Sequence, residues 1–317
     1  VAKLLTLRGG GRSLAGLRWF NLPEYVAARL GAVEVSEYSL TSRTGLLDQD
    51  HGQPWPEMLA YLGVGPDFLP PLVTAGAGLG PATATWLPPA FRGAELTVAG
   101  HDHLVAAVAD GVIPPDRLHA SFGTAEVLLR ALEGPLTFQA RARLADRLIN
   151  CVHHVVPGQH VLVAGVRTGL LLRRVLQLLG ITDRAGRERL DADVLALPPS
   201  GRLAEEVLQV RGARNDDGVL SVNIRGDGVT PAEIFSAILR HSGDELQLLI
   251  DAMDREVPPA RSTLLTGGWA AMRSVQRART AVLPGVTVSA RSQDTAYGAA
   301  RFAARLLAAP VHAPPFP

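Results

Sequence analysis

Cysteine is nearly absent from this sequence, since Cys151 is the only one among 317 residues. One thiol cannot build an internal disulfide framework, which excludes the small disulfide-stabilised secreted proteins and fits a reducing cytoplasm. Cys151 lies in the apolar stretch 148–156, a setting that favours a buried structural thiol over a nucleophile. We therefore expect a cytoplasmic protein without disulfides.

An excess of one charge is also absent. Lysine and arginine number 31 against 30 for aspartate and glutamate, so no net field attracts nucleic acid or an acidic membrane surface. Arginines interrupt the apolar stretch 162–180, and no run approaches the length of a membrane helix. The N-terminus has no secretory pattern and begins with Val1 rather than Met, which suggests a fragment or a processed chain. We expect small-molecule ligands, no nucleic acid and no membrane.

What the sequence does contain is typical of a globular α/β protein. Hydrophobic residues make up 47%, charged residues 19% and aromatic residues 5%, and the length fits two α/β domains or one large one. Strand and helix patterns alternate most clearly in the C-terminal part. There we predict, in order, a strand at 263–266, a glycine turn, a helix at 269–280, a strand at 286–290 and a helix at 295–307.

The other elements follow from periodicity and capping residues. Asn21, Pro23 and Gly31 frame a predicted helix at 24–30. Further helices are expected at 54–62, 104–112, 140–149, 169–179, 190–197 and 231–253, the last with a break at Gly243. Short strands are expected at 33–38, 96–99 and 119–122, loops at 65–89 and 201–217, and a disordered proline-rich tail at 308–317.

The first candidate for chemistry is the run Gly100-His101-Asp102-His103, between a predicted strand and an apolar helix. The helix dipole and free backbone N–H groups stabilise a carboxylate at a helix N-terminus, so Asp102 can accept a proton from a substrate hydroxyl. The structural alternative is that Asp102 only caps the helix. A metal site at His101 and His103 is the weaker option, because no third ligand lies at a recognisable spacing.

Two glycine turns are candidates for binding phosphate or nucleotide. Gly123-Thr124 follows the predicted strand 119–122; the glycine lets backbone approach a phosphate and the threonine hydroxyl can donate to it, although an ordinary hairpin turn explains the pair as well. Gly267-Gly268 stands between a predicted strand and a predicted helix, where helix-terminal N–H groups face a ligand above the turn. A tight strand-to-helix connection is the alternative there.

Taken in order, several segments resemble the FGGY carbohydrate kinases, most closely the xylulokinase-like branch. The run 2–5 resembles the start of that family's Lys-Leu-Leu-Trp-Leu segment, 19–31 its Leu-Pro-Asp-Tyr helix and 39–48 its Ala-Ser-Arg-Thr-Leu-Leu-Asp segment. Further on, 99–103 stands at the Gly-x-x-Asp motif and 298–300 matches the closing Gly-Ala-Ala helix. The resemblance extends from residue 2 to about residue 307.

The resemblance implies two actin-like, ribonuclease-H-like α/β domains with the active site in the cleft between them. Residues 1–115 would be the rear part of the first domain, on the sugar side, and 116–307 the second, nucleotide-binding domain, before the tail 308–317. The family begins with an Asp-x-Gly-Thr segment that nothing here matches, so the first domain is expected to be incomplete. This departure puts the activity of the chain as given in doubt.

The resemblance also implies roles for single residues. Asp102 would be the catalytic base, His101 and His103 would contact the substrate, and ATP and Mg²⁺ would be the cofactors. The nucleotide-binding residues would be Gly123, Thr124, Gly267 and Gly268. Ala125 replaces the serine of the family's Gly-Thr-Ser turn, which removes one hydroxyl.

Three functions are weighed on these grounds. The leading hypothesis is a sugar or polyol kinase, and the second is a regulatory or catalytically impaired relic of the same fold that binds sugar or nucleotide. The third, a metal-dependent hydrolase using His101, Asp102 and His103, is the weakest. The sugar or polyol and the oligomeric state stay open, with a homodimer as one option.

Overall fold

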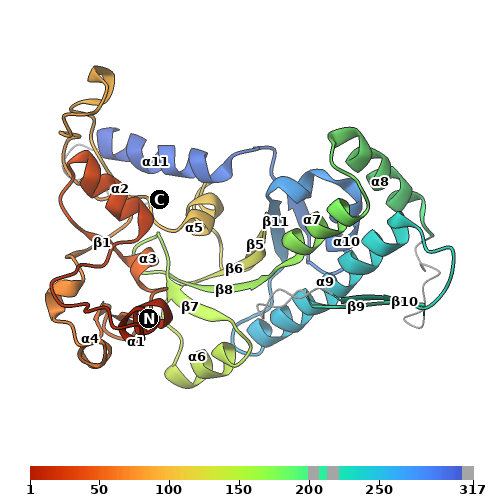
Figure 1. The fold of residues 1–317 in the computed structure, drawn as a ribbon, viewed down its shortest axis with the longest axis horizontal. Coiled ribbons are helices and arrows are strands. Elements are labelled where there is room, and N and C mark those ends of the chain that lie inside the picture. Colours follow the sequence, from red (N-terminus) through yellow and green to blue (C-terminus); the bar gives the residue numbers. More distant parts are fainter. Residues whose placement is uncertain (199–206, 213–220, 309–317) are drawn as a thin grey trace.

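The computed structural model describes residues 1–198, 207–212 and 221–308 (Figure 1). Most of the predicted loop 201–217, and all but the first residue of the predicted tail 308–317, lie outside these described residues. Within them, no helix combines the length and apolar character that a membrane span requires.

The centre of the fold is a six-stranded mixed sheet. Its strands in spatial order are β12 (Val286–Val288), β11 (Ser262–Thr266), β5 (Arg117–Phe122), β6 (Glu126–Leu132), β8 (His160–Val166) and β7 (Asn150–His153). β11 runs parallel to both β12 and β5, whereas β5 with β6 and β7 with β8 form antiparallel hairpins joined through β6 and β8. The strands predicted at 119–122, 263–266 and 286–290 are therefore confirmed, with small changes at their ends.

Both faces of this sheet are covered, which explains why β6 is buried throughout and apolar at five of its seven positions. Leu128 and Leu132 point into a large core shared with the helices of the C-terminal half. Val127 and Leu129 point to the opposite face, into a smaller core closed by α5 (Asp102–Ala107) and by α11 (Asp294–Ala308). The hairpin of β5 and β6 thus forms part of both cores.

The helices of the large core agree with most of the predicted ranges. They are α6 (Phe138–Ala145), α7 (Thr168–Leu178), α8 (Arg184–Ala196), α9 (Pro231–Asp254) and α10 (Arg273–Thr280). α9 is continuous, so the expected break at Gly243 is wrong; a Cβ at Gly243 would lie 3.1 Å from Val282 Cγ2, and the glycine serves close packing instead. A hairpin of β9 (Leu208–Arg211) and β10 (Ser221–Ile224) lies beside α9.

The helix predicted at 269–280 is divided in the structure. A 3-10 turn, Gly268–Ala271, precedes α10, and the backbone between them is extended at Met272. The carboxylate of Asp191, on α8, accepts hydrogen bonds from the backbone N–H groups of Arg273 and Ser274 at 3.0 and 2.8 Å. A side chain from another helix therefore caps a new helix start that no local pattern predicts.

The N-terminal half consists of short elements around small cores. They are α1 (Ala2–Gly9), α2 (Leu22–Leu30), β1 (Ser36–Glu37), α3 (Tyr38–Thr41), β2 (Leu47–Asp48), β3 (Gln53–Pro54), α4 (Pro56–Leu62) and β4 (Leu72–Val73), with 3-10 turns at Pro66–Phe68 and Pro89–Phe91. The predicted frame of α2 is confirmed: Asn21 and Glu24 form a capping box, and Gly31 ends the helix with φ 109°.

Two predictions in this half are wrong or too long. No strand forms at 96–99, where the nearest pairing is an isolated bridge between Pro81 and Glu95. The apolar helix expected at 104–112 ends as α5 at Ala107, because the chain turns at Gly111 with φ 124°. The predicted strand 33–38 is reduced to the two residues of β1.

The last helix, α11, packs back onto this half of the molecule. Figure 1 shows α11, the final blue helix, above α5 rather than with the other C-terminal helices, and α11 and α5 are in contact. The packing is tight, since a Cβ added to Gly298 would lie 2.3 Å from the carbonyl oxygen of Val105. Phe302 belongs to the same buried cluster as Leu104. α11 thereby fixes the position of α5 and of the residue that begins it, Asp102.

Candidate active site

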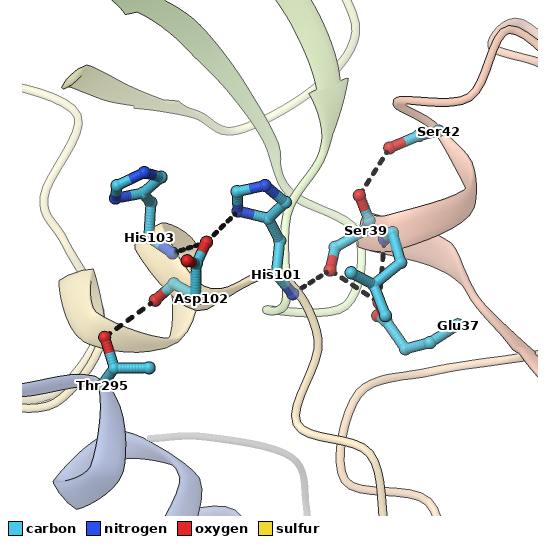
Figure 2. Close-up of polar contacts among 8 residues, drawn as sticks. Glu37, Ser39, Ser42, His101, Asp102, His103 and Thr295 are labelled. Atoms are coloured by element: carbon cyan, nitrogen blue, oxygen red, sulfur yellow. Dashed lines mark hydrogen bonds and ion pairs between the residues drawn. The ribbon is translucent and has the colours of Figure 1, made fainter. Parts of the chain in front are cut away.

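Asp102 is the first residue of α5, and its side chain is 66% exposed. His101 occupies the N-cap position, so the alternative that Asp102 is only the cap is wrong. The carboxylate accepts a hydrogen bond from its neighbour's backbone, His103 N, at 2.8 Å, and Thr295 on α11 donates to the Asp102 carbonyl (Figure 2). A carboxylate held at a helix start yet open to solvent is suited to meet a ligand.

The two histidines flank Asp102 as stacked rings with centroids 5.6 Å apart. His101 Nδ1 lies 3.0 Å from Asp102 Oδ1, without the alignment of a hydrogen bond. Burial, with a smaller effect of the Arg43 charge, lowers the pKa of His101 to about 4, and burial also lowers the pKa of His103. Both rings are neutral near pH 7, so each can donate one hydrogen bond and accept another.

A second layer of polar residues fixes the loop before Asp102. Ser39 Oγ accepts a hydrogen bond from His101 N at 3.0 Å and donates to Glu37 Oε2 at 2.6 Å (Figure 2). Glu37 is fully buried. Gly100 adopts φ 103°, and a Cβ there would lie 2.6 Å from Ser39 Oγ, so only glycine fits this position.

The second predicted site residue pair, Gly123 and Thr124, forms the turn between β5 and β6. Gly123 N donates to Ala125 O at 2.9 Å, and the strands close with Phe122 opposite Glu126. The pair is thus a hairpin turn, as one alternative stated. Thr124 is exposed, and Ala125 packs against the core cluster that contains α5.

The third predicted pair, Gly267 and Gly268, follows β11, and both residues are exposed. β11 pairs with β5 through Thr266 and Ser121, which places Gly267 beside Phe122. A Cβ on Gly267 would lie 2.4 Å from the Phe122 carbonyl oxygen, and its φ is 95°. The two glycine turns therefore lie next to each other at one end of the sheet, with their backbones in near contact.

Sequence reasoning missed a third glycine at this point, Gly169 in the first turn of α7. A Cβ on Gly169 would lie 1.8 Å from the Gly123 carbonyl oxygen and 2.8 Å from Trp269 Nε1. The next residue, Leu170, donates its N–H to Thr124 O at 2.8 Å. The start of α7 thus supports the Gly123-Thr124 turn directly, which only the spatial arrangement reveals.

Replacing Gly169 with alanine should displace this turn. The new methyl group has no space, and overpacking of this kind costs about 1–3 kcal/mol. We expect a lower free energy of unfolding in urea. Gly134→Ala is the matched control, because a Cβ there meets no atom within 4 Å. If Gly169→Ala and Gly134→Ala have the same free energy of unfolding, the close contact between Gly169 and the Gly123 carbonyl oxygen is wrong.

α5, which begins at Asp102, is connected to the Gly123-Thr124 turn through the smaller core. α5 packs on the face of β6 that carries Val127, and the cluster they share also contacts Ala125 in the turn. His119 lies on β5, and its Nε2 is 3.4 Å from Thr266 Oγ1. Among the described residues, no group of three or more metal-binding side chains forms.

A buried ion pair, also missed from the sequence, lies directly behind the hairpin turn. Arg279 donates to both carboxylate oxygens of Glu126 at 2.6 and 2.7 Å, and to Ser242 Oγ at 2.8 Å. Both charged side chains are fully buried, and the guanidinium carbon lies 5.0 Å from the centre of the Phe122 ring. This pair ties the start of β6 to α9 and α10.

Burial raises the pKa of Glu37 from 4.5 to about 7, against hydrogen bonds from Ser39 and Leu40 that lower it. Glu37 loses its carboxyl proton near pH 4.5 in the unfolded chain and near pH 7 in the folded protein. The stability that protonated Glu37 supplies therefore decreases as the pH rises from about 4.5 to about 7. Glu37→Gln keeps a neutral group. The free energy of unfolding of Glu37→Gln, relative to that of wild type, should therefore increase by up to about 3 kcal/mol as the pH rises from about 5 to about 8.

Urea unfolding of both proteins across this pH range tests the expectation. The difference between variant and wild type isolates Glu37 from the buried histidines, whose lowered pKa values make the protein less stable at acid pH instead. Glu57→Gln, in α4, serves as a control at an exposed glutamate. Parallel stability curves for Glu37→Gln and wild type would disprove the raised pKa.

Comparison with known proteins identifies the fold. No protein-family model and no curated protein match the sequence. Solved structures match over most of the chain. A xyloylose kinase from Brucella ovis matches 97% of this chain with a TM-score of 0.76 and 19% identity. A gluconate kinase from Lactobacillus acidophilus matches 96% with a TM-score of 0.75 and 15% identity, and a glycerol kinase with ADP from Plasmodium falciparum matches 91% with a TM-score of 0.69 and 15% identity. The chain spans 64%, 63% and 58% of their lengths, which is less than two thirds of each.

Identities this low establish the fold alone. The similarity nevertheless extends over nearly the whole chain and includes three kinases that differ in the substrate they are named for. The fold class predicted from the sequence is confirmed: the chain has the α/β fold of sugar and polyol kinases, the actin-like, ribonuclease-H-like ATPase fold.

Proposed function

We propose that the protein belongs to the FGGY carbohydrate kinases and acts in the ATP-dependent phosphorylation of a sugar or polyol hydroxyl. The observation that carries this proposal is the shared fold together with an exposed carboxylate, Asp102, at the start of α5, whose core cluster extends to Ala125 in the first of two adjoining glycine turns. Residues 1–115 would carry the acceptor side and 116–307 the nucleotide side. A neutral pair of histidines beside Asp102 supports a hydroxyl-bearing acceptor, because each ring can donate and accept a hydrogen bond.

In this proposal Asp102 accepts the proton of the attacking hydroxyl. Its exposure leaves room for a substrate. His101 and His103 would orient neighbouring hydroxyls. The path from Glu37 through Ser39 to His101 holds the loop in place, so that the carboxylate does not have to reorganise during the reaction.

The nucleotide would be held by the two turns. Gly123 and Gly267 lack side chains where strand ends converge, and Gly268 and Thr124 are exposed with room above them. These residues fit a phosphate chain, because backbone N–H groups and the Thr124 hydroxyl can donate to its oxygens. Bound ATP supplies the phosphoryl group, and Mg²⁺ neutralises its charge. Mg²⁺ is commonly held by one or two carboxylates and by phosphate oxygens, so this site requires no cluster of protein ligands.

The experiment is an ATP-dependent phosphorylation assay over a panel of pentoses, ketoses and polyols. It is run with residues 1–317 and with the product of the full gene. Turnover of one substrate class would establish the kinase and name its acceptor. Tight binding of sugar or ATP by the folded full-length protein without any turnover would support the impaired relic instead, for which the missing hydroxyl at Ala125 is the local reason.

A further inference from the structure

A cavity of about 250 Å³ lies between the turn that joins β7 to β8 and the segment from Glu37 to Gly52. It is separate from the Asp102 carboxylate and from the glycine turns, none of which lines it. Its walls come from sequence segments far apart, including Tyr38, Thr74 and the hairpin residues His153 to His160. At about 30 Å³ for each water molecule, this space matches about eight waters.

Polar atoms without a protein partner are concentrated around this cavity. Buried polar atoms are normally hydrogen-bonded, so such a concentration indicates a ligand site. Two of the side chains involved, Glu37 and His154, are 0% and 4% exposed. Among the described residues, the side chains that line the cavity carry these buried atoms without a hydrogen-bond partner: Glu37 Oε1, His153 Nε2, His154 Nε2, Gln159 Oε1 and both ring nitrogens of His160.

The chemistry of these groups favours a neutral ligand. Burial lowers the pKa of His154 and of His160 to about 4, so both rings are neutral near pH 7. The described residues contain no group of three ligands for a metal. Neutral imidazoles, an amide and a carboxyl group each offer donors and acceptors together, and hydroxyl groups complement both.

The shape of the cavity adds a flat wall. The rings of Tyr38 and His153 lie 5.5 Å apart, and those of His153 and His160 lie 4.5 Å apart. Stacked rings present a face to C–H groups while their edges carry the hydrogen-bonding atoms. A compact molecule with a carbon skeleton and several hydroxyl groups satisfies the wall and the polar atoms at once.

The cavity is also in direct contact with the loop that positions Asp102. Glu37 is one of the residues that line the cavity, its Oε2 accepts a hydrogen bond from Ser39, and Ser39 in turn accepts from His101 N (Figure 2). Gly100 touches the hairpin turn as well, since a Cβ there would lie 2.6 Å from Val155 Cγ1. A ligand that moves the hairpin or Glu37 would therefore move the backbone next to Asp102.

We propose that this cavity binds a small neutral molecule carrying several hydroxyl groups, and that its occupation shifts the backbone at His101 through Glu37 and Ser39. Binding is independent of the proposed function. Only an effect of the bound molecule on turnover would rest on the proposed function.

The test uses NMR titrations of the protein with glycerol, erythritol and ribitol, one at a time and without ATP. At least one should cause saturable shifts of the His153, His154 and His160 ring signals together with the His101 amide. His160→Phe keeps a ring and removes both nitrogens, and should weaken this binding by roughly tenfold or more. Gln159→Met is the second variant, and both are checked for an unchanged thermal melt.

Two controls locate the binding. Gln247→Met makes the same chemical change on an exposed side chain of α9 and should leave the titration unchanged. Asp102→Asn should also leave it unchanged, which separates this cavity from the proposed active site. No saturable shift with any of the three polyols would overturn the proposal. So would saturation by inorganic phosphate or zinc alone, or binding that depends on Asp102 and not on His160 or Gln159.

Discussion

Asp102→Asn should lower the turnover of the full-length protein by about 10²- to 10⁴-fold, the range expected when a general base is lost. The amide is almost the same size as the carboxylate, and its oxygen can still accept the hydrogen bond from His103 N, which is 2.8 Å long in the wild type. Under the proposed function, what it loses is the ability to take a proton from the substrate. The measurement is kcat under saturating ATP and acceptor, with the thermal midpoint as a check on folding.

Asp110→Asn is the matched control for this variant. Asp110 lies in the same stretch of chain beyond α5 and forms an exposed ion pair with Arg291, so its turnover should stay close to wild type. If the two variants retain similar activity, Asp102 is not the base. If Asp102→Asn loses activity only because KM rises, the side chain binds substrate without transferring its proton.

Arg279→Met should produce the largest loss of stability, about 3–5 kcal/mol, because it leaves the Glu126 carboxylate buried without a countercharge. The two side chains form a bidentate contact with hydrogen bonds of 2.6 and 2.7 Å. Because both are fully buried, bulk water cannot solvate the carboxylate once the arginine is removed. Burial already raises the pKa of Glu126, and Arg279 opposes this rise. Urea unfolding near neutral pH gives the free-energy difference directly.

The double variant Glu126→Met/Arg279→Met distinguishes the isolated charge from a general packing defect. Removing both charges eliminates the buried unpaired carboxylate, so the double variant should be more stable than Arg279→Met. Arg143→Ala, which breaks an exposed pair with Glu256, should change the unfolding midpoint little. A double variant that is less stable than the single one would mean that shape, rather than charge, decides the effect.

Local signals predicted those parts of the fold that local interactions determine. The frame of α2 was predicted from Asn21, Pro23 and Gly31, and the structure forms the capping box and the left-handed C-cap there. The alternation in the C-terminal part gave β11, β12 and α11 with nearly correct ends. In each case the residues that specify the element lie within it or directly beside it.

The errors arise where distant residues decide. α10 begins at Arg273 because Asp191, 83 residues away from Ser274, caps it. The Glu126 and Arg279 side chains are 153 residues apart in sequence and meet only in the folded core. No pattern in a single sequence reports such contacts.

The candidate site also consists of residues that local signals predicted and of supporting residues that they did not. Asp102 and the two glycine turns were marked by local residue types and by the resemblance, and their roles stay proposals. Their supports, Ser39 under His101 and Gly169 under the Gly123 carbonyl, follow only from the tertiary contacts. A small residue in a first helical turn, such as Gly169, is the one weak signal that sequence reading could have used.

The position of α11 has a consequence for how the chain acquires its structure. The last helix of the described residues covers α5, and it places Phe302 in the core with Leu104 and Val105, some 200 residues earlier. During synthesis the N-terminal half would leave the ribosome with that apolar surface open, and it could not close until residues 294–308 had emerged. Because such contacts join distant parts of the chain, folding should be slow, and completion of the Asp102 region should be its final step.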